Sequence, residues 1–189
     1  MRFEFKEHTQ VVKKITSLYK SDGVKQALQY IEDLAQENKL DTGYVWQLKA
    51  SLFSKAKMPG KEIISYTKAL ETDDQHVGLY FLRGRAFYKY KLYQKAVADF
   101  TDGLITCEEQ LDMYFETILY FYRAHAYYEL GLYEKSLEDL NEVPYDYVGW
   151  TDDLKSKEDL IRFIERKISD SSPLSEMAAR IDEIDKRMS

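Results

Sequence analysis

The residue types that most often carry out catalysis are few in this chain of 189 residues, and they lie far apart in the sequence. The chain has one cysteine and three histidines, which are Cys107, His8, His76 and His125. His76 follows the sequence DDQ, and such a cluster holds a metal only when three or four ligands converge, usually with a spacing such as H-x₃-H or C-x₂-C. Neither spacing occurs in the sequence. We interpret this segment as a turn and expect no metal site.

The sequence shows neither an activated nucleophile nor a phosphate-binding loop. A nucleophilic thiol requires a fixed base, and no histidine can be paired with Cys107. The glycines of Asp22-Gly23 and Pro59-Gly60 are typical of turns between helices rather than of phosphate loops. Adjacent carboxylates such as Glu108 and Glu109 diverge by about 100° on a helix, so they do not face one substrate. We therefore predict a protein that is not an enzyme and uses no cofactor.

The composition favours a helical chain that stays in solution. Only 8 glycines and 3 prolines are present, whereas an all-β domain needs turn residues every ten positions or so. A net charge of −6 argues against a generic nucleic-acid binder, whose affinity comes mainly from neutralising phosphates. The N-terminal sequence MRFEFKEHTQVVKK is too charged for a secretory signal, and no stretch approaches the ~18 apolar residues of a membrane span. These features predict a cytoplasmic protein that does not associate with membranes.

A sparse pattern of small and aromatic residues recurs along the chain. Small residues are each followed three positions later by an aromatic residue, as in Ala50 and Phe53, Gly84 and Phe87, and Ala124 and Tyr127. The small positions are separated by 34 and then 40 residues, and a weaker copy precedes them. Small residues let two helices approach closely, while the aromatic residues fill the space between them. We expect the six extra residues of the longer interval to lengthen the helices around 108–117.

The pattern resembles the tetratricopeptide repeat (TPR), a helix–turn–helix unit of 34 residues. Trp46 falls on the family's tryptophan position, and Tyr80 and Tyr120 occupy it in the next two copies. The resemblance covers about residues 8–145. It implies an all-α fold, a right-handed superhelix or α–α solenoid, with a concave surface lined by the first helix of each repeat. The repeats are expected at about 8–42, 43–76, 77–116 and 117–150.

The period ends after Pro144, and two further helices are predicted. Thr151, followed by two aspartates, is typical of a helix N-terminus and predicts a capping helix at 151–169. A polar linker and an amphipathic tail helix follow at 170–189. The apolar residues of this tail form an a/d seam of two heptads. The tail helix can dock on the solenoid, join two chains in a homodimer or contact another protein.

The resemblance also implies which residues line the concave surface. Carried onto this sequence, the candidates are Tyr44, Gln47, Lys55, Phe81, Arg85, Tyr88, Lys89, Phe121, Tyr122, His125 and Tyr128. The asparagines and paired lysines with which some relatives clamp a C-terminal carboxylate are not matched. Tyrosine, phenylalanine and arginine are the residue types that anchor protein interfaces. We expect most of six of them to be solvent-accessible (Phe81, Arg85, Tyr88, Tyr122, His125 and Tyr128); the alternative is that the aromatic ones pack between repeats.

Together these features predict a non-enzymatic protein-binding module that holds a helix or extended segment of another polypeptide. Three roles fit such a module: an adaptor, a small chaperone of a bacterial secretion system, or an immunity protein that neutralises a toxin. Two less favoured alternatives are a nucleic-acid binder and a hydrolase or metal-dependent enzyme around His76 or His125.

Overall fold

A computed structural model describes residues 5–111, 114–145, 147 and 154–170, and the secondary structure of these residues is helical. The chain divides into two compact units, Met1–Leu111 (unit 1) and Asp112–Ser189 (unit 2). The predicted tail helix lies outside the described residues. Within the part of the chain that is described, no helix is long and apolar enough to cross a membrane.

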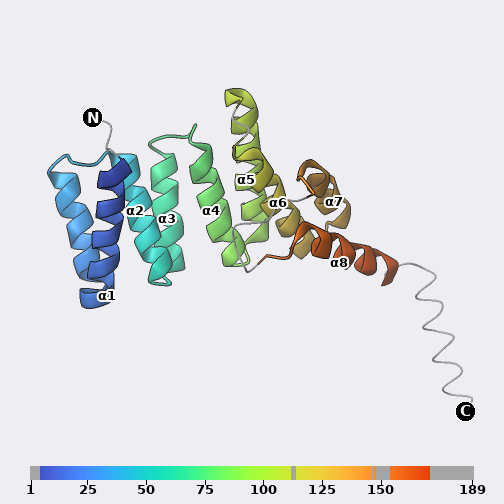
Figure 1. Cartoon of the computed structure of the whole chain (residues 1–189), viewed down its shortest axis with the longest axis horizontal. Helices are drawn as coiled ribbons and strands as arrows, with labels where there is room; N and C mark the ends of the chain where they lie inside the picture. The colour runs from blue at the N-terminus through green and yellow to red at the C-terminus, as the bar shows by residue number, and fades with distance from the viewer. Residues whose placement is uncertain (1–4, 112–113, 146, 148–153, 171–189) are drawn as a thin grey trace, which may run out of the picture. The chain divides into compact units, whose positions relative to one another are not determined.

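Unit 1 consists of five helices in which each contacts the next along the chain (Figure 1). They are α1 (Phe5–Gln36), α2 (Thr42–Lys55), α3 (Pro59–Leu70), α4 (Val77–Lys89) and α5 (Tyr93–Gln110). Helix α1 is interrupted at Gly23, whose φ of 84° and ψ of −174° are not helical. Since L-residues with a side chain rarely adopt this conformation, Gly23 makes the predicted turn between two halves of α1.

The helix pairs turn through the same corner. Lys57, Lys91 and Gly131 lie one residue beyond the C-caps of α2, α4 and α6, and all three have a φ between 54° and 73°. Behind each corner, the next N–H donates to a carbonyl five residues earlier, for example from Leu92 to Phe87 at 2.9 Å. This bond satisfies a carbonyl that the helix leaves without a partner. The corner positions are separated by 34 and 40 residues, as the repeat pattern requires.

The small residues of the pattern let the paired helices approach, as predicted. At Gly84 of α4, an added Cβ would lie 2.5 Å from Cε1 of Phe100 on α5, which is shorter than van der Waals contact allows. Ala50 belongs to a buried cluster that joins α2, α3 and α4 and includes Tyr66 and Leu79. A separate cluster joins the two halves of α1 to α2.

Helix α5 accommodates the six extra residues of the long interval. It has 18 residues, whereas α3, the second helix of the preceding pair, has 12. The prediction of a lengthened helix at this place is therefore confirmed. The added length exposes apolar side chains, including Ile105 and Leu111.

The described residues of unit 2 form one helix pair and a helix that packs on it. The pair is α6 (Glu116–Glu129) and α7 (Tyr133–Glu142), and α8 (Lys157–Asp170) contacts both. Helix α8 begins six residues later than the predicted capping helix, because Leu154, Lys155 and Ser156 are not helical. The cap is Ser156 instead, whose Oγ accepts a hydrogen bond from the N–H of Asp159 at 3.1 Å. Thr151 lies outside the described residues.

Candidate binding surface

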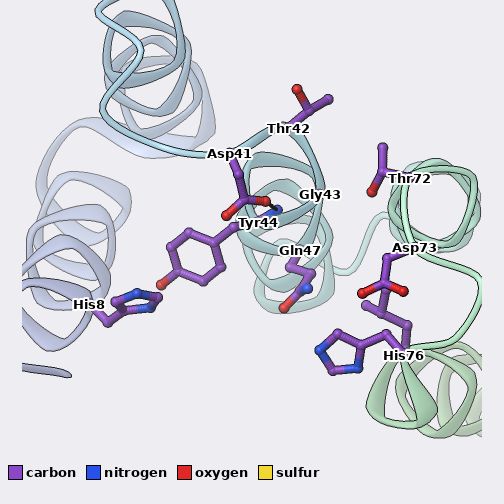
Figure 2. A pocket seen from close by; sticks show the side chains of 10 residues that line it. His8, Asp41, Thr42, Gly43, Tyr44, Gln47, Thr72, Asp73 and His76 are labelled. Atoms are coloured by element: carbon purple, nitrogen blue, oxygen red, sulfur yellow. Dashed lines mark hydrogen bonds between the residues drawn. The ribbon is translucent and has the colours of Figure 1, made fainter. Parts of the chain in front are cut away.

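Two residues of the predicted concave surface, Tyr44 and Gln47, line a pocket of about 740 Å³ in unit 1 (Figure 2). Three helices form it: α1 contributes His8, α2 contributes its first turn, and the start of α4 contributes His76. Figure 2 shows the side chains of Gln47 and His76 across the pocket from His8. The pocket therefore lies where the N-terminal ends of the first helices of three successive pairs meet.

A helix cap and a turn residue supply the negative charge of this pocket. Asp41 is the N-cap of α2, and its Oδ1 accepts a hydrogen bond from the N–H of Tyr44 at 2.8 Å. Asp73 lies in the turn before α4, where its Oδ1 accepts from the N–H of Gln75 at 3.2 Å. The ring of Tyr44 also packs on the ring of His8, with 4.5 Å between the centroids. Burial, and then the charge of Asp41, raise the pKa of Tyr44, so its hydroxyl remains a hydrogen-bond donor at neutral pH.

The lining suits a cationic or amide group. It holds two carboxylates and no lysine or arginine, with a tyrosine ring beside them. An ammonium or guanidinium group is attracted both by carboxylates and by an aromatic face. Among the described residues, no three histidine, cysteine or acidic side chains are arranged to hold a metal ion.

At the opposite ends of these helices the surface carries basic residues. The hydroxyl of Tyr19 on α1 donates to the carbonyl of Lys55 on α2 at 3.1 Å. Lys89 on α4 donates from Nζ to Ser54 Oγ of α2 and to Glu62 Oε2 of α3, both at 3.1 Å. Helices α1, α2 and α4 are thus joined near both ends. The surface runs from the acidic pocket toward these lysines.

The charge of Lys89 is already used within unit 1. Burial lowers the pKa of its ammonium group, but hydrogen bonds with Tyr90 and Glu62 outweigh this effect, and the net shift is upward. Glu62 is itself buried, and the ion pair with Lys89 compensates its charge. Lys89 therefore stabilises the α3–α4 contact. Of the three predicted cations of this surface, Lys55 and Arg85 have no ion pair among the described residues.

Arg85 and Phe81 form the central part of this surface. The guanidinium carbon of Arg85 lies 5.6 Å from the ring centroid of Phe81, and Arg85 is exposed while Phe81 is only 7% exposed. Phe81, one of the six residues of which most were expected to be accessible, is therefore buried, and its ring forms the base on which Arg85 rests. Tyr88 is half-buried, and its ring packs on that of Tyr93 with 5.4 Å between centroids.

In unit 2 the predicted surface is covered. Phe121, Tyr122 and His125 are each 2% exposed or less. With Phe81, three of the six residues of which most were expected to be accessible are therefore buried, so that expectation is wrong. The cause is the chain that follows α7: the ring of Tyr147 packs on Phe121 with 5.1 Å between centroids, and the carbonyl of Lys155 lies 3.0 Å from Nε2 of His125. The half-buried Tyr128 lies under the ammonium group of Lys155, 4.7 Å from its ring centroid.

His125 is a neutral histidine in this environment. Burial lowers its pKa to about 4, although the hydrogen bond with Lys155 works in the opposite direction. A carbonyl oxygen only accepts, so Nε2 of the neutral ring carries the proton and donates it. His125 is consequently a structural donor to the main chain.

Most of the pocket is not predicted from the sequence. His8 and His76 lie far apart in the chain, and the sequence pattern does not indicate that Asp41 and Asp73 form a pair. A usable signal exists in the period: Asp41 and Gln75 lie 34 residues apart, so the two turns before α2 and α4 occupy equivalent positions and the same edge of unit 1.

Comparison with known proteins identifies the fold. No family model matches the sequence, and no curated protein is similar to it. Among solved structures, MamA 41-end from Desulfovibrio magneticus RS-1 aligns over 95% of both chains with a TM-score of 0.61 and 14% identity. The Arabidopsis OM64 TPR domain aligns with a TM-score of 0.52 and 19% identity, over 66% of this chain and 94% of that domain.

A third structure, the first TPR of Spaghetti (RPAP3) bound to the HSP90 peptide SRMEEVD, aligns over 67% of this chain and 95% of its own length, with a TM-score of 0.54 and 20% identity. These similarities confirm the predicted fold class: the chain has the all-α TPR fold.

Proposed function

We propose that this chain is a non-enzymatic protein-binding module, and that the surface of unit 1 from the pocket to Arg85 holds a segment of a partner polypeptide. One observation carries the proposal. Tyr44 and Gln47, which the TPR resemblance implies for the concave surface, line an open pocket, and Arg85 on the same series of helix positions is exposed with no ion pair among the described residues. An exposed arginine resting on a buried aromatic ring is a common anchor of protein interfaces.

The charges of the surface define the partner's chemistry. The pocket, with Asp41 and Asp73, suits a lysine or arginine side chain or a peptide amino terminus. Arg85 and Lys55 suit a carboxylate further along the segment. We therefore propose a segment with a basic group at one end and an acidic group at the other.

The RPAP3 domain, whose structure holds the peptide SRMEEVD, provides a precedent for a short peptide on this fold. The present chain does not match the asparagines and paired lysines that clamp a C-terminal carboxylate in some TPR proteins. We therefore propose that it selects a different sequence class. Adaptor, secretion chaperone and toxin immunity protein are all roles that such a contact would serve, and the identity of the partner distinguishes them.

Fluorescence polarisation with labelled peptides tests the proposal. A library that varies the charge at each end is measured against the full chain, with SRMEEVD as a comparison peptide. Peptides that are basic at one end and acidic at the other should bind best, and Arg85→Glu should weaken them at least about tenfold, since it reverses a charge at the interface. Lys25→Glu, an exposed change on the second half of α1, is the matched control. Equal affinities for Arg85→Glu and the unchanged protein would exclude this surface.

A further inference from the structure

Three positions that are equivalent in the repeat pattern differ in their surroundings. Ser51, Arg85 and His125 follow one another at intervals of 34 and 40 residues, each on the first helix of its pair. Ser51 and Arg85 are exposed, whereas His125 is 1% exposed. The helix pairs are alike, so the difference arises from the residues that pack on α6 after α7 has ended.

These residues contact α6 as a bound polypeptide would. Nε2 of His125 donates to the main-chain carbonyl of Lys155 at 3.0 Å, which is a contact to backbone and independent of the side chain that carries it. The ammonium group of Lys155 then lies between two rings, 4.7 Å from the centroid of Tyr128 and 5.3 Å from that of Phe163 on α8. A cation between aromatic faces is a specific contact.

The helix that follows supplies apolar anchors. Leu160 and Ile164 of α8 are four residues apart, on one face of the helix, and both are fully buried against unit 2. Laying an amphipathic helix on a hydrophobic surface is a recurring mode of peptide recognition. Phe163, which borders this face three residues after Leu160, is exposed.

Tyr147, one of the residues that cover the inner face of α6, is not fully satisfied in its hydrogen bonding. Its ring packs on Phe121, but its hydroxyl is buried and has no hydrogen-bond partner among the described residues. Burial, together with the neighbouring Tyr122, raises the pKa of Tyr147 to about 12, which keeps this unpartnered hydroxyl protonated. A buried polar group without a partner costs free energy that a different occupant would not incur.

We propose that the inner face of α6, formed by Phe121, Tyr122, His125 and Tyr128, is a second docking surface. The chain's own residues occupy it as an intramolecular ligand: Tyr147 covers Phe121, and the segment 154–170 covers His125 and Tyr128. A partner helix of the same chemistry displaces this segment: a lysine whose carbonyl meets His125, followed five and nine residues later by aliphatic side chains that take the places of Leu160 and Ile164. This site lies within unit 2 and does not depend on the proposed function of unit 1.

A peptide of residues 154–170, added to the full-length protein, tests the proposal directly. Lys155→Ala in the protein removes the cation from both rings and weakens the intramolecular ligand, so the labelled peptide should bind this variant about tenfold more tightly than the unchanged protein. Tyr147→Phe removes the unpartnered hydroxyl and strengthens the cover, so the peptide should bind about tenfold more weakly. Hydrogen exchange at the amides of α6 should rise in the first variant and fall in the second.

Arg162→Ala is the matched control, because Arg162 lies on the same helix and pairs only with the exposed Asp159 among the contacts described. This variant should bind the peptide as the unchanged protein does. Circular dichroism verifies that each variant is folded. Opposite shifts for Lys155→Ala and Tyr147→Phe support displacement, whereas no binding to Lys155→Ala, or equal binding to all four proteins, overturns the proposal. Arg85→Glu should leave the peptide affinity unchanged, which separates this result from any failure at the unit 1 surface.

Discussion

The α4–α5 pair of unit 1 and the α6–α7 pair of unit 2 have the same framework and different inner faces. In one, Nε and an NH2 of Arg83 hold the two carboxylate oxygens of Asp99 at 2.9 and 2.7 Å. In the other, Arg123 holds Asp139 in the same way at 2.8 and 2.7 Å. Forty residues separate the two arginines, and forty separate the two aspartates. On the inner face, however, Arg85 is exposed and its counterpart His125 is buried.

The comparison shows that different parts of the chain determine the framework and the binding surface. Both partners of the arginine–aspartate pair lie inside one helix pair, so each of these two helix pairs carries its own connection between helices. The accessibility of the inner face depends on what packs against it, and in unit 2 that is Lys155 and α8. Two helix pairs with the same framework can therefore provide one open surface and one that is already occupied.

The largest expected effect comes from breaking the shared framework. Arg83→Ala leaves Asp99 buried, where burial already raises the pKa of that carboxyl, and should lower the free energy of unfolding by about 3–5 kcal/mol. Arg123→Ala should cost a similar amount because Asp139 is held in the same way. Urea denaturation of both variants measures this. A second change, Asp99→Asn, should restore part of the loss in Arg83→Ala, and clearly unequal costs for the two arginines would contradict a common framework.

The second largest effect is a pH dependence of the free energy of unfolding, which comes from the buried His125 on the covered face of α6. The pKa of His125 falls from 6.5 in the unfolded chain to about 4 in the folded one, so protons bind the unfolded chain preferentially between these values. The stabilisation is complete above pH 6.5 and is lost as the pH falls toward 4, by up to about 3 kcal/mol. Denaturation at a series of pH values should show this loss in the unchanged protein and a shallower dependence in His125→Gln. Parallel pH profiles would mean that His125 is accessible to solvent.

A smaller effect should follow from exchanging the small residues of the two pairs. Gly84→Ala places a Cβ against the ring of Phe100 and should destabilise unit 1 by about 2 kcal/mol. The reverse exchange, Ala124→Gly, creates no clash and should cost about 1 kcal/mol through helix propensity. Thermal unfolding followed by circular dichroism ranks the two, and a larger cost for Ala124→Gly would mean that the helices of unit 1 are less closely packed than described.

The smallest effect on stability should be found at the open surface. Arg85→Ala should change the free energy of unfolding by no more than about 0.5 kcal/mol, because Arg85 is exposed and makes no ion pair among the described residues. The same substitution at its counterpart, His125→Ala, should cost about 2 kcal/mol, since it leaves the buried carbonyl of Lys155 without a donor. Denaturation of both variants under the same conditions gives the contrast. Equal costs would remove the distinction between the two faces.

The sequence predicts most of the framework because the framework is local and periodic. The small positions at Gly84 and Ala124 and the longer α5 follow from spacing, and the turn at Gly23 follows from the Asp22-Gly23 dipeptide. The covered face could not be predicted this way. It depends on Tyr147 and Lys155, which follow α7 and contact α6 in a way that no period encodes. The pocket could be predicted only in part. Its two carboxylates, Asp41 and Asp73, lie in turns whose equivalence is visible in the repeat period, but each accepts an ordinary local hydrogen bond from the main chain, and this gives no signal of a binding site.

Two of the three corners between paired helices are less stable than a glycine would make them. These two place a lysine, Lys57 or Lys91, in a left-handed conformation, and only Gly131 has the residue that adopts it without strain. The chain thus contains both a lysine and a glycine at corners that have the same hydrogen-bonding pattern. Because the corners are remote in sequence from one another, exchanging each lysine for glycine should improve thermal tolerance additively. An engineer who needs a sturdier scaffold for either docking surface can begin there without altering the residues that bind.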